Sequence, residues 1–126
     1  MSYLLHVEDD ARKQHSIHRV VELYAPKCRY LHIPSSGEAL LILERHPDAV
    51  HAMLSDWNLP EEYQGKPDEK NGRLVAMRAS QLELPTLIIS GDLKPAGFER
   101  DFPPYIQWAP FDWASVIRDF LKEHAS

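Results

Sequence analysis

Short apolar runs alternate with helical patterns along almost the whole chain, and this alternation limits the possible folds more than any other feature of the sequence. Five runs of strand length occur, at residues 3–7, 29–33, 49–55, 86–90 and 105–108. Strands of a parallel sheet are buried on both faces, and helices join them and cover the sheet. The alternation therefore predicts an α/β fold in which a parallel sheet of five strands lies between two layers of helices.

Four segments between or after these runs have the spacing of an amphipathic helix. They begin after Asp10, after Ser35, at Gly72 and after Asp112. Ser35 and Glu38 are spaced as in a capping box, and Asp10 and Asp112 stand where side chains cap helices. In the first helix, one face carries Ile17, Val20, Val21 and Tyr24. The side chains expected to point inward are Leu74, Val75, Ala79 and Leu82 in the third helix and Trp113, Val116, Ile117 and Phe120 in the last.

Two connections are predicted to be irregular. Residues 61–71 are polar and contain glycine and proline, so we expect a loop there. Residues 91–104 contain three prolines and two glycines. Proline removes a backbone donor and breaks helices, so the helix that would join the fourth and fifth strands is expected to be reduced or absent.

Composition and charge restrict the class of protein. The chain has 126 residues, of which 44% are apolar and 26% charged, and we expect residues 1–126 to form one domain. The net charge is −5 and no basic face is visible, so we expect no nucleic-acid partner. No apolar run approaches the roughly 18 residues of a membrane span, the first residues lack the basic region of a signal peptide, and Cys28 is the only cysteine. We therefore expect a cytoplasmic protein without a membrane partner.

Acidic side chains follow the strands at positions that a parallel sheet would bring together. Glu8 and Asp9 come directly after the first run, Asp56 follows the third, and Ser90 ends the fourth. Ligands bind at the carboxyl ends of the strands in such sheets, so the carboxylates would converge if the first and third strands are neighbours. Carboxylates in one place repel one another, and Mg²⁺ relieves the repulsion because it prefers oxygen ligands. Asp56 would then also be placed to act as a nucleophile toward phosphorus.

The segments VEDD, SDWNLP and LIISGD, at residues 7–10, 55–60 and 87–92, resemble the receiver domains of two-component response regulators when they occur in this order on this pattern. The resemblance covers nearly the whole chain and implies a flavodoxin-like three-layer sandwich with strand order 2-1-3-4-5. It implies that Asp56 accepts a phosphoryl group and that Ser90 is the switch hydroxyl. The other residues matched are the Mg²⁺ ligands, which are Glu8, Asp9, Asp56 and the backbone carbonyl of Asn58, and the two positions that tune dephosphorylation, Asn58 and Asp92.

The resemblance also implies partners and a function. We expect a single-domain response regulator that receives its phosphoryl group from a sensor histidine kinase or a histidine phosphotransfer protein and signals to a downstream protein. Such a protein is a phospho-acceptor and not an enzyme, with at most slow self-dephosphorylation.

The sequence departs from the receiver pattern after the fifth run. Receiver domains have a Lys-Pro pair there, and this chain has Ala109 before Pro110. The missing lysine normally pairs with the phosphoryl group, and the loss of one charge-assisted contact costs about 1.5–3 kcal/mol. Lys94 and Arg73 are the candidate substitutes.

Two other functions are open at this point. One is a pseudo-receiver, in which Ala109 has disabled switching and the domain acts as a phosphorylation-independent interaction adaptor. The other is a phosphatase similar to the haloacid dehalogenases, but these use Asp-x-Asp, and Asn58 stands where the second aspartate would donate a proton. By themselves, Asp56 and Ser90 are also compatible with a turn cap and a loop hydroxyl. Trp57 is expected to lie exposed at the rim of the site, where a partner could cover it.

Overall fold

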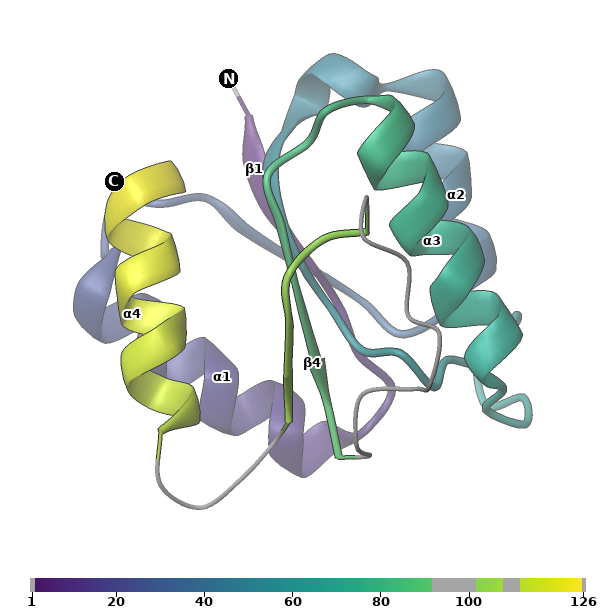
Figure 1. Ribbon diagram of the computed structural model, residues 1–126, viewed down its shortest axis with the longest axis horizontal. Coiled ribbons are helices and arrows are strands. Elements are labelled where there is room, and N and C mark those ends of the chain that lie inside the picture. The colour runs from purple at the N-terminus through teal and green to yellow at the C-terminus, as the bar shows by residue number, and fades with distance from the viewer. Residues whose placement is uncertain (1, 92–101, 108–111, 126) are drawn as a thin grey trace.

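The structure is a computed structural model, which describes residues 2–91, 102–107 and 112–125. Five strands and four α-helices are present in these residues, and the sheet lies between the helices (Figure 1). The strands are β1 (Tyr3–Val7), β2 (Tyr30–Ile33), β3 (Val50–Ser55), β4 (Thr86–Ser90) and β5 (Tyr105–Gln107). The helices are α1 (Ala11–Tyr24), α2 (Ser36–Arg45), α3 (Glu69–Gln81) and α4 (Trp113–His124), with a 3₁₀ turn at Pro47–Ala49.

The sheet is parallel throughout and has the order β2-β1-β3-β4-β5. The predicted flavodoxin-like order is therefore confirmed. Val7 at the end of β1 is level with Ile33 of β2 and with Ser55 of β3. The carboxyl ends of these three strands thus form one edge, and the residues after β1 and β3 leave the sheet side by side.

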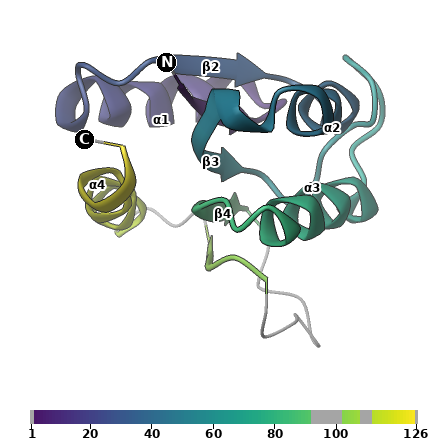
Figure 2. The same cartoon turned by 90° about the horizontal axis from the view of Figure 1, so that it is seen from above.

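Helices cover both faces of the sheet, as the three-layer prediction requires (Figure 2). On one face, α1 and α4 pack on alternate strand residues, and the core there includes Leu4, Ile17, Leu54, Ile89 and Ile117. On the other face, α2 and α3 enclose a second core that includes Leu5, Val7, Leu43, Met53 and Val75. The central strands are apolar on both faces because each face is covered by a helix pair.

Helix α3 corrects the sequence-based prediction in two respects. It begins at Glu69 and not at Gly72, because the side chain of Asp68 accepts a hydrogen bond from the Lys70 amide at 2.8 Å and so caps it. The predicted loop therefore ends three residues earlier. Leu74 was expected to face the core, but its side chain is 45% exposed, since the inward face of this helix passes through Val75.

The capping box predicted at Ser35 is wrong, although Ser35 does precede α2. Its hydroxyl donates to Glu38 Oε1 at 3.2 Å and makes no capping bond to the helix backbone. The first amides of α2 are instead satisfied by the chain that follows β3: Ser36 N–H donates to the Pro60 carbonyl and Gly37 N–H to the Glu61 carbonyl, each at 2.9 Å. Asp112 precedes α4 but likewise makes no side-chain capping bond.

Several predictions fall on parts of the chain outside the described residues. The connection in which we expect a reduced or absent helix falls mainly in residues 92–101, which include Asp92 and Lys94, and Ala109 falls in residues 108–111. These expectations stay predictions. Among the helices of residues 2–91, 102–107 and 112–125, none is long and apolar enough to cross a membrane.

Candidate functional site

The end of β1 positions two acidic residues at the carboxyl edge of the sheet. The Glu8 amide continues the ladder to β2 by donating to the Ile33 carbonyl at 3.0 Å. The His32 ring donates through Nε2 to the Glu8 carbonyl at 2.6 Å, since a carbonyl can only accept. Asp10 then caps α1 as predicted, accepting from the amides of Arg12 at 2.9 Å and Lys13 at 3.1 Å. The backbone of Glu8 is therefore held on both sides before the helix begins.

Asp56 lies directly after β3, on the strand next to β1. Its amide donates to the Val7 carbonyl at 2.9 Å, which extends the ladder by one residue. Its Oδ1 accepts from the Trp57 amide at 2.7 Å, so the side chain has a fixed orientation. Asp56 is only 8% exposed, and burying a carboxylate to this degree is unfavourable without compensating partners.

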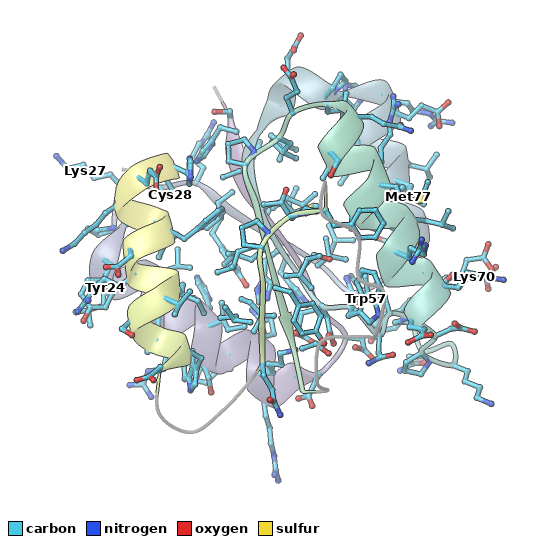
Figure 3. The ribbon with its side chains drawn as sticks, viewed as in Figure 1. Tyr24, Lys27, Cys28, Trp57, Lys70 and Met77 are labelled. Carbon is cyan, nitrogen blue, oxygen red and sulfur yellow. The ribbon has the colours of Figure 1, made fainter. Side chains whose placement is uncertain are left out.

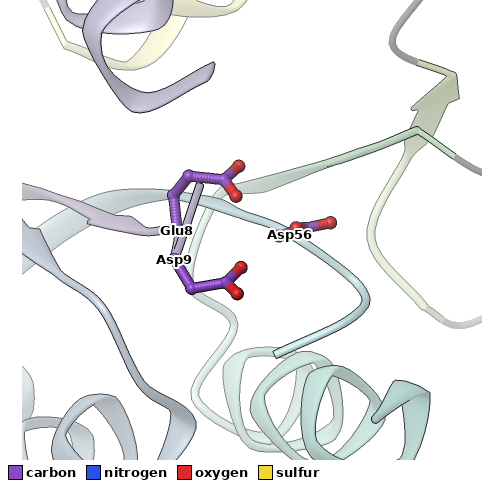
Figure 4. Close-up of side chains that lie close together, drawn as sticks. All are labelled: Glu8, Asp9 and Asp56. Atoms are coloured by element: carbon purple, nitrogen blue, oxygen red, sulfur yellow. The ribbon is translucent and has the colours of Figure 1, made fainter. Parts of the chain in front are cut away.

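The three predicted carboxylates converge. Carboxylate oxygens of Glu8, Asp9 and Asp56 all lie within 4.8 Å of one another (Figure 4). Glu8 and Asp56 are buried and Asp9 is exposed, so the cluster has a closed side and an open side. The convergence follows from the strand order, because β1 and β3 are adjacent and end at the same level.

Burial and mutual repulsion shift the proton equilibria of this cluster. Burial, followed by the charge of Asp56, raises the pKa of Glu8 to about 9, and the smaller opposing effect comes from Lys13. Burial and Asp56 also raise the pKa of Asp9. Without a metal ion, the pocket therefore favours a protonated Glu8 at neutral pH, which leaves fewer negative charges close together.

A lysine that the sequence analysis did not single out enters this pocket. Lys13 Nζ lies 3.0 Å from Glu8 Oε1 and 3.3 Å from Asp56 Oδ1, and it donates to the Ile89 carbonyl at 2.7 Å. The side chain is on α1 and Lys13 is 8% exposed. A signal was present in the sequence: Lys13 is four residues before Ile17, and therefore on the inward face of the helix.

The chain after Asp56 is held tightly against α3. The Asn71 side chain donates to the Leu59 carbonyl at 2.8 Å, and a Cβ at Gly72 would lie 1.9 Å from the Trp57 carbonyl oxygen. Only glycine allows the helix to approach the backbone this closely. The glycine and the asparagine at the start of α3 thus fix the turn that contains Asp56 and Asn58.

The prediction that Trp57 lies exposed at the rim is wrong. Trp57 is 3% exposed and packs with Ala76 and Ile88, beside α3 (Figure 3). Its ring also contacts Phe102 and Tyr105, each with ring centroids 6.2 Å apart. The site is not covered by an exposed tryptophan; the indole instead connects the turn after Asp56 to the chain that leads into β5.

The remaining predicted residues have different outcomes. Ser90 is fully buried at the end of β4, and the next residue, Gly91, lines the same cavity as Asp56. Asn58 lies in the turn after Asp56 and is half-buried. Arg73 is exposed on α3, and its guanidinium lies over the Phe102 ring, 5.1 Å from the ring centre. Asp92, Lys94 and Ala109 are outside the described residues.

The donor set fits a hard divalent cation. Carboxylate oxygens are the ligands that Mg²⁺ prefers, usually one or two together with water, and Glu8, Asp9 and Asp56 supply three of them within one small region. The raised pKa values of Glu8 and Asp9 indicate that the pocket accumulates more negative charge than its surroundings stabilise. A divalent cation would reverse both effects.

Comparison with solved structures finds proteins of the same fold. The chain is similar to the Mn²⁺-bound form of the response regulator Rcp1, with a TM-score of 0.73 and 16% identity over 97% of this chain and 93% of that one. It is also similar to the phosphorylated cyanobacterial phytochrome response regulator RcpA, with a TM-score of 0.72 and 14% identity over 97% and 93% of the two chains. The chain therefore has the fold of response regulator receiver domains.

The fold alone does not define the function. A de novo designed Rossmann 2x3 protein matches with a TM-score of 0.69 and 14% identity over 100% of this chain and 94% of that one. No protein-family model matches the sequence, and no curated protein matches it significantly. Proteins of this fold differ in function through the side chains at the carboxyl edge of the sheet, where this chain brings Glu8, Asp9 and Asp56 together.

Proposed function

We propose that this chain is a response regulator that accepts a phosphoryl group on Asp56 in a Mg²⁺-dependent reaction. The observation that supports the proposal best is the convergence of Glu8, Asp9 and Asp56 within 4.8 Å at the carboxyl edge of a receiver fold. Glu8, Asp9, Asp56 and the Asn58 carbonyl would hold the ion. A bound Mg²⁺ would offset the charge of these carboxylates and of the phosphoryl oxygens.

The side chains around Asp56 suit the transfer step. A carboxylate oxygen of Asp56 forms a bond to phosphorus while the P–N bond of a phosphohistidine donor breaks, and the electron pair of that bond stays on the imidazole nitrogen. The Trp57 amide, 2.7 Å from Asp56 Oδ1, keeps the carboxylate in one orientation. The Ser90 hydroxyl, at the end of the adjacent strand, would donate to a phosphoryl oxygen, and such preorganised donors are the main source of stabilisation in phosphoryl transfer.

The donor in this proposal is a sensor histidine kinase or a histidine phosphotransfer protein in the cytoplasm, and the signal passes to a downstream protein. The chain itself is not an enzyme with a separate substrate. Asn58 and Asp92, each two residues beyond a principal site residue, would set a slow self-dephosphorylation.

A pseudo-receiver is the alternative, and one feature of the sequence favours it. Ala109 stands where receiver domains have a lysine, so the usual counter-charge for a phosphoryl group is missing from that position. In this alternative the acidic residues are retained without phosphorylation and the domain acts as an interaction adaptor.

The two functions are separated by incubating the protein with phosphoramidate and Mg²⁺ and recording its intact mass. We expect one phosphoryl group to be added, to be released by hydroxylamine as an acyl phosphate is, and to be absent after Asp56→Asn or in the presence of EDTA. An unmodified wild-type protein at saturating Mg²⁺ would instead support the pseudo-receiver. Neither a response regulator nor a pseudo-receiver should hydrolyse a generic phosphate ester faster than buffer does, whereas a phosphatase should.

A further inference from the structure

The buried lysine of α1 is the least expected feature of the site. Lysine is almost never fully buried unless its ammonium group is paired, and Lys13 is 8% exposed. Its ammonium group contacts the ends of three strands: Glu8 after β1 at 3.0 Å, Asp56 after β3 at 3.3 Å, and the Ile89 carbonyl in β4 at 2.7 Å. The lysine therefore connects the same strand ends that build the candidate site.

The first turn of α1 determines where this lysine points. The Asp10 cap accepts from the Lys13 amide and fixes the start of the helix. Lys13, Ile17 and Val21 are the buried residues of α1 and are spaced four apart, so Lys13 continues the stripe that packs on the sheet. The methylene chain of the lysine extends along this apolar stripe while its charged end reaches the carboxylates, the usual arrangement of a partly buried lysine.

A cavity of about 450 Å³ opens beside the Asp56 carboxylate. The residues that line it are Asp10, Arg12, Lys13, Ser16, Asp56 and Gly91. Two positively charged side chains from the first turn of α1 thus face the same space as the carboxylate that would be phosphorylated. A phosphoryl group bound to Asp56 would need both space and positive charge on this side.

We propose that Lys13 binds the phosphoryl group on Asp56 and supplies the positive charge that residue 109, an alanine, does not. This inference rests on the proposed function. Phosphorylation adds a second negative charge to residue 56, and the nearest cation on the described part of the chain is already 3.3 Å from Asp56 Oδ1. In this inference the role of the missing lysine is taken by a residue of α1.

The test is a beryllofluoride titration at saturating Mg²⁺, since beryllofluoride mimics the aspartyl-phosphate. Lys13→Met removes the charge at similar length, and Lys13→Arg keeps it. Lys27→Met is the matched control, because Lys27 is exposed at the other edge of the sheet (Figure 3). We expect Lys13→Met to weaken beryllofluoride binding about 10- to 100-fold, the range for one charge-assisted contact. Lys13→Arg should lose less, and Lys27→Met should not change it.

The affinity for Mg²⁺ alone gives the necessary second readout. Lys13 shares Glu8 and Asp56 with the proposed ion, so Lys13→Met should bind Mg²⁺ at least as tightly as the wild type. Parallel loss of Mg²⁺ and beryllofluoride affinity would overturn the inference, because it would mean that Lys13 only maintains the pocket. Unchanged beryllofluoride affinity in Lys13→Met would overturn it too, while leaving the proposed function in place.

A measurement on the wild-type protein keeps the inference testable even where Lys13→Met does not fold. With ¹⁵N-labelled lysine, the Lys13 side-chain resonance, assigned by its loss in Lys13→Arg, should shift when beryllofluoride is added to the Mg²⁺-saturated protein. A resonance that shifts with Mg²⁺ and does not respond to beryllofluoride would contradict a phosphoryl contact. A wild-type protein that neither binds beryllofluoride nor becomes phosphorylated would overturn the proposed function together with this inference.

Discussion

The two sides of Asp56 differ in what they contribute. On the side of α1, its neighbours are the ionisable side chains of Glu8 and Lys13, with Lys13 Nζ 3.0 Å from Glu8 Oε1 and 3.3 Å from Asp56 Oδ1. On the side of α3, its neighbours are backbone: the turn through Trp57 is held against Gly72 and hydrogen-bonded to Asn71. One side offers charge that can exchange partners, and the other keeps the acceptor in place. The ionisable side chains of the site thus lie on one side of Asp56, and the backbone contacts that hold Asp56 in place lie on the other.

The largest effect is expected from the residue between the two sides. Asp56→Asn keeps the size of the side chain and removes the nucleophile, so we expect complete loss of phosphorylation by phosphoramidate, measured as intact mass. Asp48→Asn is the control, because Asp48 is exposed in the 3₁₀ turn before β3, away from the carboxyl edge of the sheet. Modification that persists in Asp56→Asn would place the acceptor elsewhere.

On the α3 side of Asp56, adding a single methyl group at Gly72 should lower the stability of the fold. Alanine at position 72 is favoured by helix propensity by about 1 kcal/mol, but its Cβ would lie 1.9 Å from the Trp57 carbonyl oxygen. Overpacking of this kind costs about 1–3 kcal/mol, and contact with rigid backbone places it at the upper end. We expect Gly72→Ala to lower the free energy of unfolding by about 2 kcal/mol net, measured by urea denaturation.

Gly91→Ala is the matched control for this change, since nothing lies within 4 Å of a Cβ at Gly91. Its free energy of unfolding should stay within about 0.5 kcal/mol of the wild type. Equal effects of the two substitutions would show that α3 does not hold the turn as described.

On the α1 side of Asp56, titration of Glu8 should make the stability of the fold depend on pH. In metal-free buffer, unfolded Glu8 titrates near 4.5 and folded Glu8 near 9, because burial and Asp56 raise its pKa. Between these values the folded state holds a proton that the unfolded state has lost, so the contribution of Glu8 to stability is fully present below about pH 4.5 and is lost as the pH rises toward 9. Glu8→Gln imitates the protonated group and should remove this part of the slope in urea denaturation at pH 5 to 8. An identical slope in both proteins would contradict the assignment.

The smallest effect is expected from Arg73, one of the candidate substitutes for the missing lysine. Arg73 lies on α3, exposed, with its guanidinium 5.1 Å from the Phe102 ring centre. Arg73→Ala should therefore change beryllofluoride affinity by less than about twofold, whereas an exposed cation–π contact of about 0.5–1 kcal/mol is lost from stability. A tenfold loss of beryllofluoride affinity in Arg73→Ala would instead show that the counter-charge for the phosphoryl group comes from Arg73 on α3 and not from Lys13 on α1.

Much of this architecture could be predicted from the sequence. Strands β1 and β4 have the predicted bounds, Tyr3–Val7 and Thr86–Ser90, because apolar runs ended by acidic or polar residues are a local signal. The convergence of Glu8, Asp9 and Asp56 followed from the strand order. These predictions depended only on which residues end which strand.

Other features depended on close contacts between distant segments and could not be read from a local pattern. Trp57 is buried because α3 and the chain before β5 close over it. At Ser35 the capping box is not formed, and the first two amides of α2 donate instead to the carbonyls of Pro60 and Glu61 from a distant segment. Lys13 is the exception. Its spacing from Ile17 places it on the inward face of α1, but lysine is usually a surface residue, so the pattern alone does not assign Lys13 to the site.

The most direct test of the account is a crystal structure of the protein grown with Mg²⁺ and beryllofluoride. The account predicts an ion coordinated by Asp9 and Asp56, an adduct on a carboxylate oxygen of Asp56, and the ammonium group of Lys13 in contact with that adduct. It would be contradicted by a structure in which Lys13 still bridges Glu8 and Asp56, with neither ion nor adduct beside them.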